Sequence, residues 1–362
     1  QTWQQPERLP PSLAQFDLAA LALRHNKIWI AGAPGTRIWH SADGGRSWQW
    51  SPTGIRTPLC ALCFVDDQHG WAVGSLGAIL ATEDGGRTWR VQRAGASRVA
   101  VLALMAELED VPLELIARLS ADEGYRSAVE VLNRRDWQSP YDMAVAPEER
   151  LHEAVVALGG CDGSLSWQFP VRAAELRLPA AQILAMWARL QQGAFADTDA
   201  EPGKYEHDEA AGQTISSESE SALRAFRAHL VQRIRMWRPE IIITNDASPQ
   251  GNDPLRHLVN QAVLQAAHEA ADRRCFAEHI DQASLEPWQV KKVYAALPPE
   301  ERGGVELSTS QFALRLGCSL AEAAALPRGL LRSQGATGSW RLGFRLLVNK
   351  LPTAEAGRDS GF

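Results

Sequence analysis

The segment Ser41-Ala42-Asp43-Gly44-Gly45-Arg46-Ser47-Trp48 recurs in closely similar form within this chain of 362 residues. The second copy, Thr82-Glu83-Asp84-Gly85-Gly86-Arg87-Thr88-Trp89, follows 41 residues later. An apolar stretch with a glycine-rich turn precedes each copy, at residues 28–35 and 71–77. Repeats of this length are typical of solenoids and propellers, whose units bury their apolar faces against one another. The repeat therefore predicts two β-sheet units within residues 1–96.

The glycines and the aspartate of the repeated motif have a mechanical interpretation. A short turn between two strands needs residues that tolerate positive φ and an acceptor for its backbone amides. The glycine pairs meet the first need, and Asp43 and Asp84 meet the second. The pattern resembles the Asp-box, and residues 64–74 resemble repeats of the photosystem II assembly-factor type of propeller. That resemblance implies a β-propeller in which these aspartates are structural.

Two blades do not close a propeller, which has about four to eight blades. We therefore expect the remaining blades to lie outside this sequence, with a second domain inserted between blades. The beginning, Gln1-Thr2-Trp3, shows neither an initiator methionine nor a signal peptide, and no apolar stretch is long enough to cross a membrane. The net charge of -6 and the lack of a basic, aromatic stretch argue against a nucleic-acid partner.

The five cysteines are scattered and odd in number, which argues against a disulfide framework. Cys60 and Cys63 form a Cys-x-x-Cys motif within an apolar segment, where a period of two places them on opposite faces of a strand. No second cysteine pair completes a zinc site. A structural role is therefore favoured over a redox or zinc role.

From residue 98 onward, apolar runs alternate with amphipathic segments. This order predicts an α/β three-layer, Rossmann-like domain over residues 97–352, with an acidic loop at 194–220 and a tail at 353–362. We expect strands at 99–104, 127–132, 240–244 and 290–294. We expect helices at 112–119, 148–158, 179–190, 217–238 and 254–271.

Polar side chains cluster in two loops that follow predicted strands. Ligands bind at the carboxyl ends of the strands in open α/β sheets, so the loops at 105–110 and 245–257 are the expected site. The candidate residues in these loops are Glu107, Glu109, Asp110, Asp246, Asp253 and His257.

The order of elements, the two loops and the phrase Val259-Asn260-Gln261-Ala262-Val263 resemble the LmbE/PIG-L family over residues 98–352. The resemblance implies a zinc-dependent enzyme that removes N-acetyl groups from glucosamine conjugates. Zinc with an open position lowers the pKa of its bound water to about 7, and a carboxylate takes the proton. In the best register Glu109 is that base, and Glu107, Asp110 and His257 are the metal ligands.

The histidines that the resemblance leads one to expect are missing or displaced. Glu107 and Leu331 stand where the family has histidine, and His257 lies one place away from its expected position. Carboxylates in place of imidazoles disfavour zinc and favour hard ions such as magnesium or calcium. The sequence therefore predicts an impaired deacetylase-like domain that binds a carbohydrate conjugate or a protein partner. An active metal-dependent amidohydrolase and a non-enzymatic assembly scaffold are the alternatives.

Each candidate residue also has a purely structural interpretation. Glu107, Glu109 and Asp110 can stabilise the positive end of a helix dipole. Asp246, which with Asp253 is a possible pocket residue, can end its strand through an Asx turn. His257 can be a partly buried helix residue. The catalytic interpretation requires these side chains to converge on one point, and the structural interpretations do not.

Overall fold

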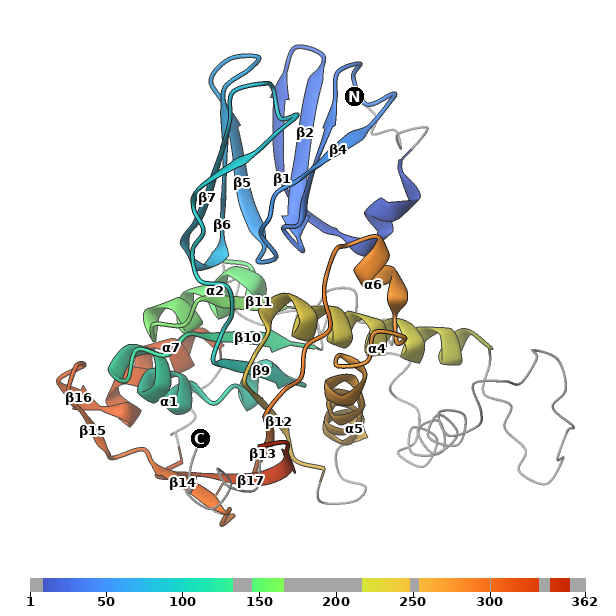
Figure 1. Cartoon of the computed structure of the whole chain (residues 1–362). Helices are drawn as coiled ribbons and strands as arrows, with labels where there is room; N and C mark the ends of the chain where they lie inside the picture. The colour runs from blue at the N-terminus through green and yellow to red at the C-terminus, as the bar shows by residue number, and fades with distance from the viewer. Residues whose placement is uncertain are drawn as a thin grey trace, which may run out of the picture.

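The computed structural model describes residues 9–132, 145–165, 217–247, 254–299, 301–331 and 339–351. Two small antiparallel sheets stand on a larger α/β domain (Figure 1). The helix predicted at 179–190 and the greater part of the acidic loop lie outside the described residues. A helix of the predicted length begins at Ser217, inside the last few residues assigned to that loop.

Each copy of the repeated motif belongs to a four-stranded antiparallel sheet with its strands in sequence order. Sheet A consists of β1 (Asp17–Arg24), β2 (Lys27–Ala33), β3 (Arg37–Ser41) and β4 (Gln49–Pro52). Sheet B consists of β5 (Leu59–Phe64), β6 (Gly70–Gly74), β7 (Ala78–Thr82) and β8 (Arg90–Arg93). The prediction of two β-sheet units is confirmed. Within the described residues, these two sheets do not form part of a closed ring of sheets.

The Asp-box turns have the hydrogen bonds that the motif predicts. Asp43 accepts hydrogen bonds from the Ser47 backbone N–H at 2.9 Å, the Ser47 hydroxyl at 2.6 Å and the Ser41 hydroxyl at 2.8 Å. These bonds, those from Ser47 foremost, hold the pKa of Asp43 well below its usual range. Gly44 and Gly45 adopt φ values of 73° and 89°, which only glycine reaches without strain. The aspartate is therefore a turn-forming residue.

Sheets A and B pack face to face. Trp29 of sheet A stacks on Phe64 of sheet B with ring centroids 3.7 Å apart. The indole N–H of Trp29 donates to the backbone oxygen of Gly85 at 2.8 Å, in the Asp-box turn of sheet B. The buried apolar residues between the sheets are Ala20, Trp29, Ala31, Ile38, Ile55, Leu59, Phe64, Ala72, Ala78, Leu80 and Trp89.

The α/β domain is built on a seven-stranded sheet in the order β11-β10-β9-β12-β13-β17-β14. The first five strands in this order pair in parallel, and β17 is antiparallel to both of its neighbours. The strands are β9 (Val101–Met105), β10 (Ser127–Val131), β11 (Asp162–Leu165), β12 (Ile241–Asn245), β13 (Lys292–Ala296), β14 (Val305–Ser308) and β17 (Arg341–Asn349). A separate two-stranded hairpin comprises β15 (Phe312–Ala313) and β16 (Cys318–Ser319).

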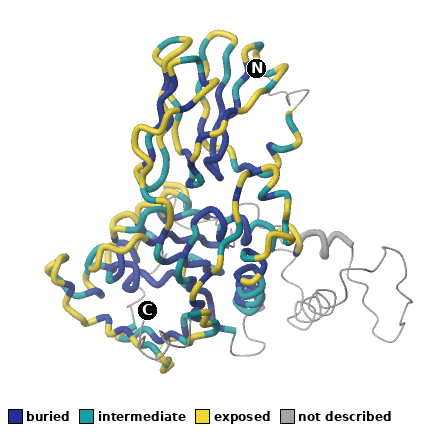
Figure 2. Tube along the Cα trace, in the orientation of Figure 1, coloured by how far each residue is buried: buried dark blue, intermediate teal, exposed yellow. Residues whose placement is uncertain are grey.

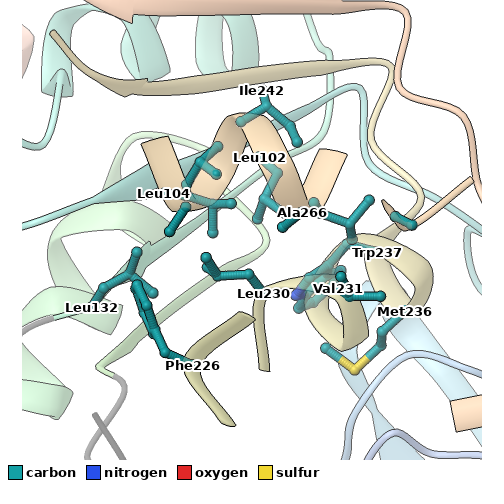
Figure 3. Close-up of a cluster of buried hydrophobic side chains, with 14 of the residues drawn as sticks. Leu102, Leu104, Leu132, Phe226, Leu230, Val231, Met236, Trp237, Ile242 and Ala266 are labelled. Atoms are coloured by element: carbon teal, nitrogen blue, oxygen red, sulfur yellow. The ribbon is translucent and has the colours of Figure 1, made fainter. Parts of the chain in front are cut away.

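Helices cover both faces of this sheet. They are α1 (Leu113–Ile116), α2 (Pro147–Ala157), α4 (Ser217–Trp237), α5 (Pro254–Glu269) and α7 (Leu320–Leu331). The short helix α6 (Ala277–Asp281) lies near sheet A, where Arg37 of β3 donates to the backbone oxygen of Asp281 at 3.4 Å. Alternate residues of β9 enter different layers. Leu102 and Leu104 pack with α4 and α5 (Figure 3). Ala103 and Met105 pack with α1, α2 and α7. The three-layer arrangement is confirmed, because both faces of the sheet are buried.

The antiparallel edge of the sheet was not predicted. β14 and β17 are short or carry mixed polar and apolar residues, and the same is true of β11 on the opposite edge. The helix predicted at 112–119 is present, but only Leu113–Ile116 are α-helical, and they lead into a π-helical segment over Ala117–Asp122. Within the described residues, no helix is long and apolar enough to span a membrane. The cysteines are free, and Cys60 and Cys63 are both exposed on β5.

Sheet A shares its core with the α/β domain. Leu13, Phe16 and Trp39 belong to the same buried cluster as the apolar face of α4, which lies beneath the small sheets (Figures 1 and 2). Arg233 of α4 donates to the carboxylate of Asp17 on β1 at 3.0 Å. The contact between sheet A and the α/β domain therefore includes both apolar packing and an ion pair.

Candidate functional site

The two predicted loops meet because β9 and β12 are parallel neighbours. Their register pairs Ile241 with Val101 and Thr244 with Leu104, so both strands end at the same edge. Asn245, at the end of β12, accepts a hydrogen bond from the backbone N–H of Ala106 at 2.7 Å. This bond fastens the loop after β9 to the end of β12. The expected meeting of the two loops is confirmed.

Asp110 lies at the centre of the polar contacts between these loops. Arg256 of α5 donates from Nε to both carboxylate oxygens of Asp110, at 3.0 and 3.1 Å, and its Nη2 lies 2.8 Å from Oδ1. The Asn245 amide and the Glu107 backbone N–H donate to Oδ2, at 2.8 and 3.2 Å. The side chain of Asp110 is only 11% exposed. Both of its oxygens are therefore directed at donors of the protein itself.

The guanidinium of Arg256 also faces the second predicted ligand. Its Nη2 lies 3.9 Å from Oε2 of Glu107, whose side chain is 14% exposed. One positive group thus lies beside two carboxylates in a largely buried place. It provides the neutralising charge that a divalent ion would otherwise supply there.

The other predicted site residues are held in different ways. His257 lies on the first turns of α5, with Nδ1 3.2 Å from the backbone oxygen of Ala247. Asp246 is paired with Arg345 of β17 at 3.1 Å. Glu109 is exposed on the short 3-10 turn after β9. Asp253 lies outside the described residues.

The donor set around Asp110 does not fit a divalent cation. Among the described residues, no group of three or more His, Cys, Asp or Glu side chains is placed to hold a metal ion. A metal bound by Asp110 would have to displace the Arg256 guanidinium from both oxygens. The metal-ligand roles of Glu107, Asp110 and His257 and the base role of Glu109 stay predictions.

Sequence reasoning missed Arg256, Asn245 and Arg345. A signal was present for Arg256, because a basic residue in the first turn of a helix opposes the helix dipole unless an acid compensates it. Arg345 gave no such signal, since it pairs with Asp246 and with Glu301 only after β17 has joined the edge of β13. Its place depends on a strand order that the sequence did not show.

We compared the chain with known protein families, curated sequences and solved structures, and only the solved structures gave matches. No family model matches the sequence, and no curated protein sequence is significantly similar to it. A conserved protein from Thermus thermophilus aligns with 71% of this chain and 98% of its own at 15% identity, with a TM-score of 0.41. An N,N'-diacetylchitobiose deacetylase from Pyrococcus horikoshii aligns with 68% of this chain and 83% of its own at 14% identity, with a TM-score of 0.42.

The YCF48 protein bound to a D1 peptide aligns with 24% of this chain and 29% of its own at 24% identity, with a TM-score of 0.21. All three similarities have low identity and low TM-scores. The residues of the site therefore carry the inference of function.

Proposed function

We propose that the α/β domain is a deacetylase-like domain that has lost metal-dependent hydrolysis and binds a carbohydrate conjugate, carried on propeller-type sheets. The observation that supports this is the Arg256 guanidinium on both oxygens of Asp110. A guanidinium neutralises the carboxylate, but it carries no bound water whose pKa it could lower, and it offers no open coordination position. Asp110 then serves to fasten α5 to the loop after β9.

The same edge of the sheet suits the recognition of hydroxyl and amide groups. Arg256 and Arg345 are 36% and 43% exposed, so their guanidinium groups reach the surface beside buried carboxylates. Exposed Glu109 adds an acceptor on the neighbouring turn. Charged donors and acceptors in fixed positions form the stronger class of hydrogen bond with polar ligands. A protein partner is the alternative occupant.

The loss of metal binding is tested with Arg256→Ala and, as a matched control, Arg345→Ala. We expect the purified wild-type protein to carry no stoichiometric metal and to release no acetate from N-acetylglucosamine conjugates. Removing the guanidinium takes away the counter-charge and frees Oδ1 of Asp110, while Asn245 and Glu107 still donate to Oδ2. We therefore expect Arg256→Ala to bind Zn²⁺ or Mg²⁺ at least about tenfold more tightly in calorimetry, equivalent to about 1.4 kcal/mol. Arg345→Ala should bind as the wild type does.

Stoichiometric metal together with acetate release by the wild-type protein would contradict this proposal and support the active amidohydrolase. Carbohydrate binding is measured separately, by saturation-transfer NMR with N-acetylglucosamine and its β-1,4-linked dimer. We expect binding that EDTA does not change and that Glu109→Ala weakens. A protein that binds neither saccharide overturns the carbohydrate part of the proposal and leaves the assembly scaffold.

A further inference from the structure

Sheets A and B each have one apolar face that the other sheet does not cover. The front face of sheet B, defined as the face away from sheet A, presents Trp71 at 39% exposure and Val73 at 42%. The back face of sheet A, defined as the face away from sheet B, presents Leu21 at 59%, Leu23 at 63% and Trp50 at 45%. On the back face, Leu21 and Leu23 form an exposed apolar pair on the edge strand β1, and Trp50 lies apart from them on β4. Exposed apolar groups such as the pair on β1 and the pair on β6 are candidates for interaction surfaces.

The strand pairing shows which residues of the two sheets correspond. Trp29 pairs with Ala22 in the first hairpin of sheet A, and Trp71 pairs with Cys63 in the first hairpin of sheet B. Trp71 is therefore the counterpart of Trp29. By the same pairing Leu23, the residue after Ala22, is the counterpart of Phe64, the residue after Cys63.

The contact between sheets A and B joins two different kinds of face. The front face of sheet A, with Trp29, packs on the back face of sheet B, with Phe64. The exposed front face of sheet B, with Trp71, is equivalent to the front face of sheet A, with Trp29. The exposed part of the back face of sheet A, with Leu23, is equivalent to the back face of sheet B, with Phe64. In the buried pair, strand β5 of sheet B contacts β1 and β2 of sheet A, and β1 is the counterpart of β5. The exposed part of the back face along β1 is therefore complementary to the exposed front face of sheet B.

We propose that the front face of sheet B binds the back face of sheet A in a second copy of this chain. Leu23 of the second copy then lies on the Trp71 ring, as Phe64 lies on Trp29. The Trp71 indole N–H donates to the Gly44 backbone oxygen of the second copy, as Trp29 donates to Gly85. The part of the back face formed by Ile30 and Trp39 is covered by the chain's own core, so the outer part makes the contact.

Such an interface is heterologous, because each copy contributes a different face. Each copy consequently keeps one free face after pairing, and association continues until a ring closes or the chain of copies ends. This association does not depend on the activity of the α/β domain.

The test uses the whole chain and two variants, Trp71→Glu on the front face and Leu23→Glu on the back face. In sedimentation velocity we expect the wild-type protein to associate with increasing concentration and each variant alone to associate at least tenfold more weakly. Val156→Glu, on the exposed side of α2 at 46% exposure, is the control and should associate as the wild type does. Circular dichroism spectra and melting curves like those of the wild type show that the variants are folded.

Mixing the two variants distinguishes this arrangement from a symmetric one. Trp71→Glu keeps an intact back face and Leu23→Glu an intact front face, so an equimolar mixture should form a dimer that neither variant forms alone. A wild-type protein that stays monomeric at every concentration overturns the proposal, whichever other partner covers the faces. A mixture that stays monomeric while the wild type associates also overturns it.

Discussion

Arg256 lies in the first turn of α5, where a positive side chain meets the positive end of the helix dipole. Its position is favourable only because Asp110 and Glu107 lie within reach of the guanidinium. Removing Arg256 would leave the largely buried carboxylate of Asp110 without its counter-charge, which is unfavourable. The ion pair therefore occupies the oxygens of Asp110 and also holds α5 against the loop after β9.

His279 is a second residue whose charge state matters for the fold. It lies on α6, is 2% exposed, and stacks on Phe276 with ring centroids 5.5 Å apart. Burial, and after it the positive charge of Arg235, lowers the pKa of His279 to about 4. The native protein thus keeps this ring neutral at a pH where the unfolded chain protonates it.

We predict that the free energy of unfolding decreases as the pH falls from about 6.5 to about 4. In this window the unfolded state binds a proton that the native state does not, so stability rises with pH. The contribution of His279 is about 3 kcal/mol at most. Urea denaturation at several pH values measures it, and His279→Phe should show a smaller loss. Equal losses for both proteins would refute this assignment.

At the level of elements, the contact between sheets A and B depends on one aromatic pair and one indole hydrogen bond. Trp29 is 1% exposed, whereas its counterpart Trp71 is 39% exposed. The same residue type in equivalent strands thus has different surroundings. The exposed Trp71 can therefore serve as the control when the effect of Trp29 on the free energy of unfolding is measured.

We predict that Trp29→Phe lowers the free energy of unfolding by about 1 to 3 kcal/mol, because the Gly85 oxygen loses its donor while ring stacking on Phe64 is kept. Trp71→Phe should change the stability of the dilute protein by less than about 0.5 kcal/mol. Chemical denaturation at low protein concentration measures both. Equal effects of the two substitutions would show that the indole bond does not stabilise the sheets.

Across the whole molecule, a buried ionic network joins the small sheets to the α/β domain. Glu130 of β10 is 1% exposed and lies 2.5 Å from His229 and 3.2 Å from Arg233, both on α4. Arg233 extends the network to Asp17 of β1. Burial raises the pKa of Glu130, but Arg233 and His229 outweigh this and leave the pKa below its usual value. The carboxylate therefore stays charged inside the protein.

We predict that Arg233→Met lowers the free energy of unfolding by about 3 kcal/mol, because Glu130 loses its permanent counter-charge. The double variant Glu130→Gln with Arg233→Met should lose less, because no buried charge is left unpaired. Arg224→Met, on the exposed side of α4, is the control. Urea unfolding followed by tryptophan fluorescence measures all three, and a double variant less stable than Arg233→Met would contradict the explanation.

The sequence alone determined the elements whose signals are local. The Asp-box turns follow from glycine conformation and a short-range acceptor, so Asp43 and Asp84 could be assigned to turns without knowledge of the fold. The strands β9, β10 and β12 and the helices α2, α4 and α5 followed from apolar periodicity. The meeting of the two loops followed from parallel strands ending at one edge.

Only the tertiary structure decided what the loops contain. Arg256 is separated from Asp110 by 146 positions, and no local pattern shows that its guanidinium reaches both carboxylate oxygens. The antiparallel edge of β17 and β14 brings Arg345 to Asp246, and strand order at a sheet edge depends on long-range pairing. Short-range conformational preferences fix turns and helices, whereas ion pairs between distant segments exist only once the chain has folded.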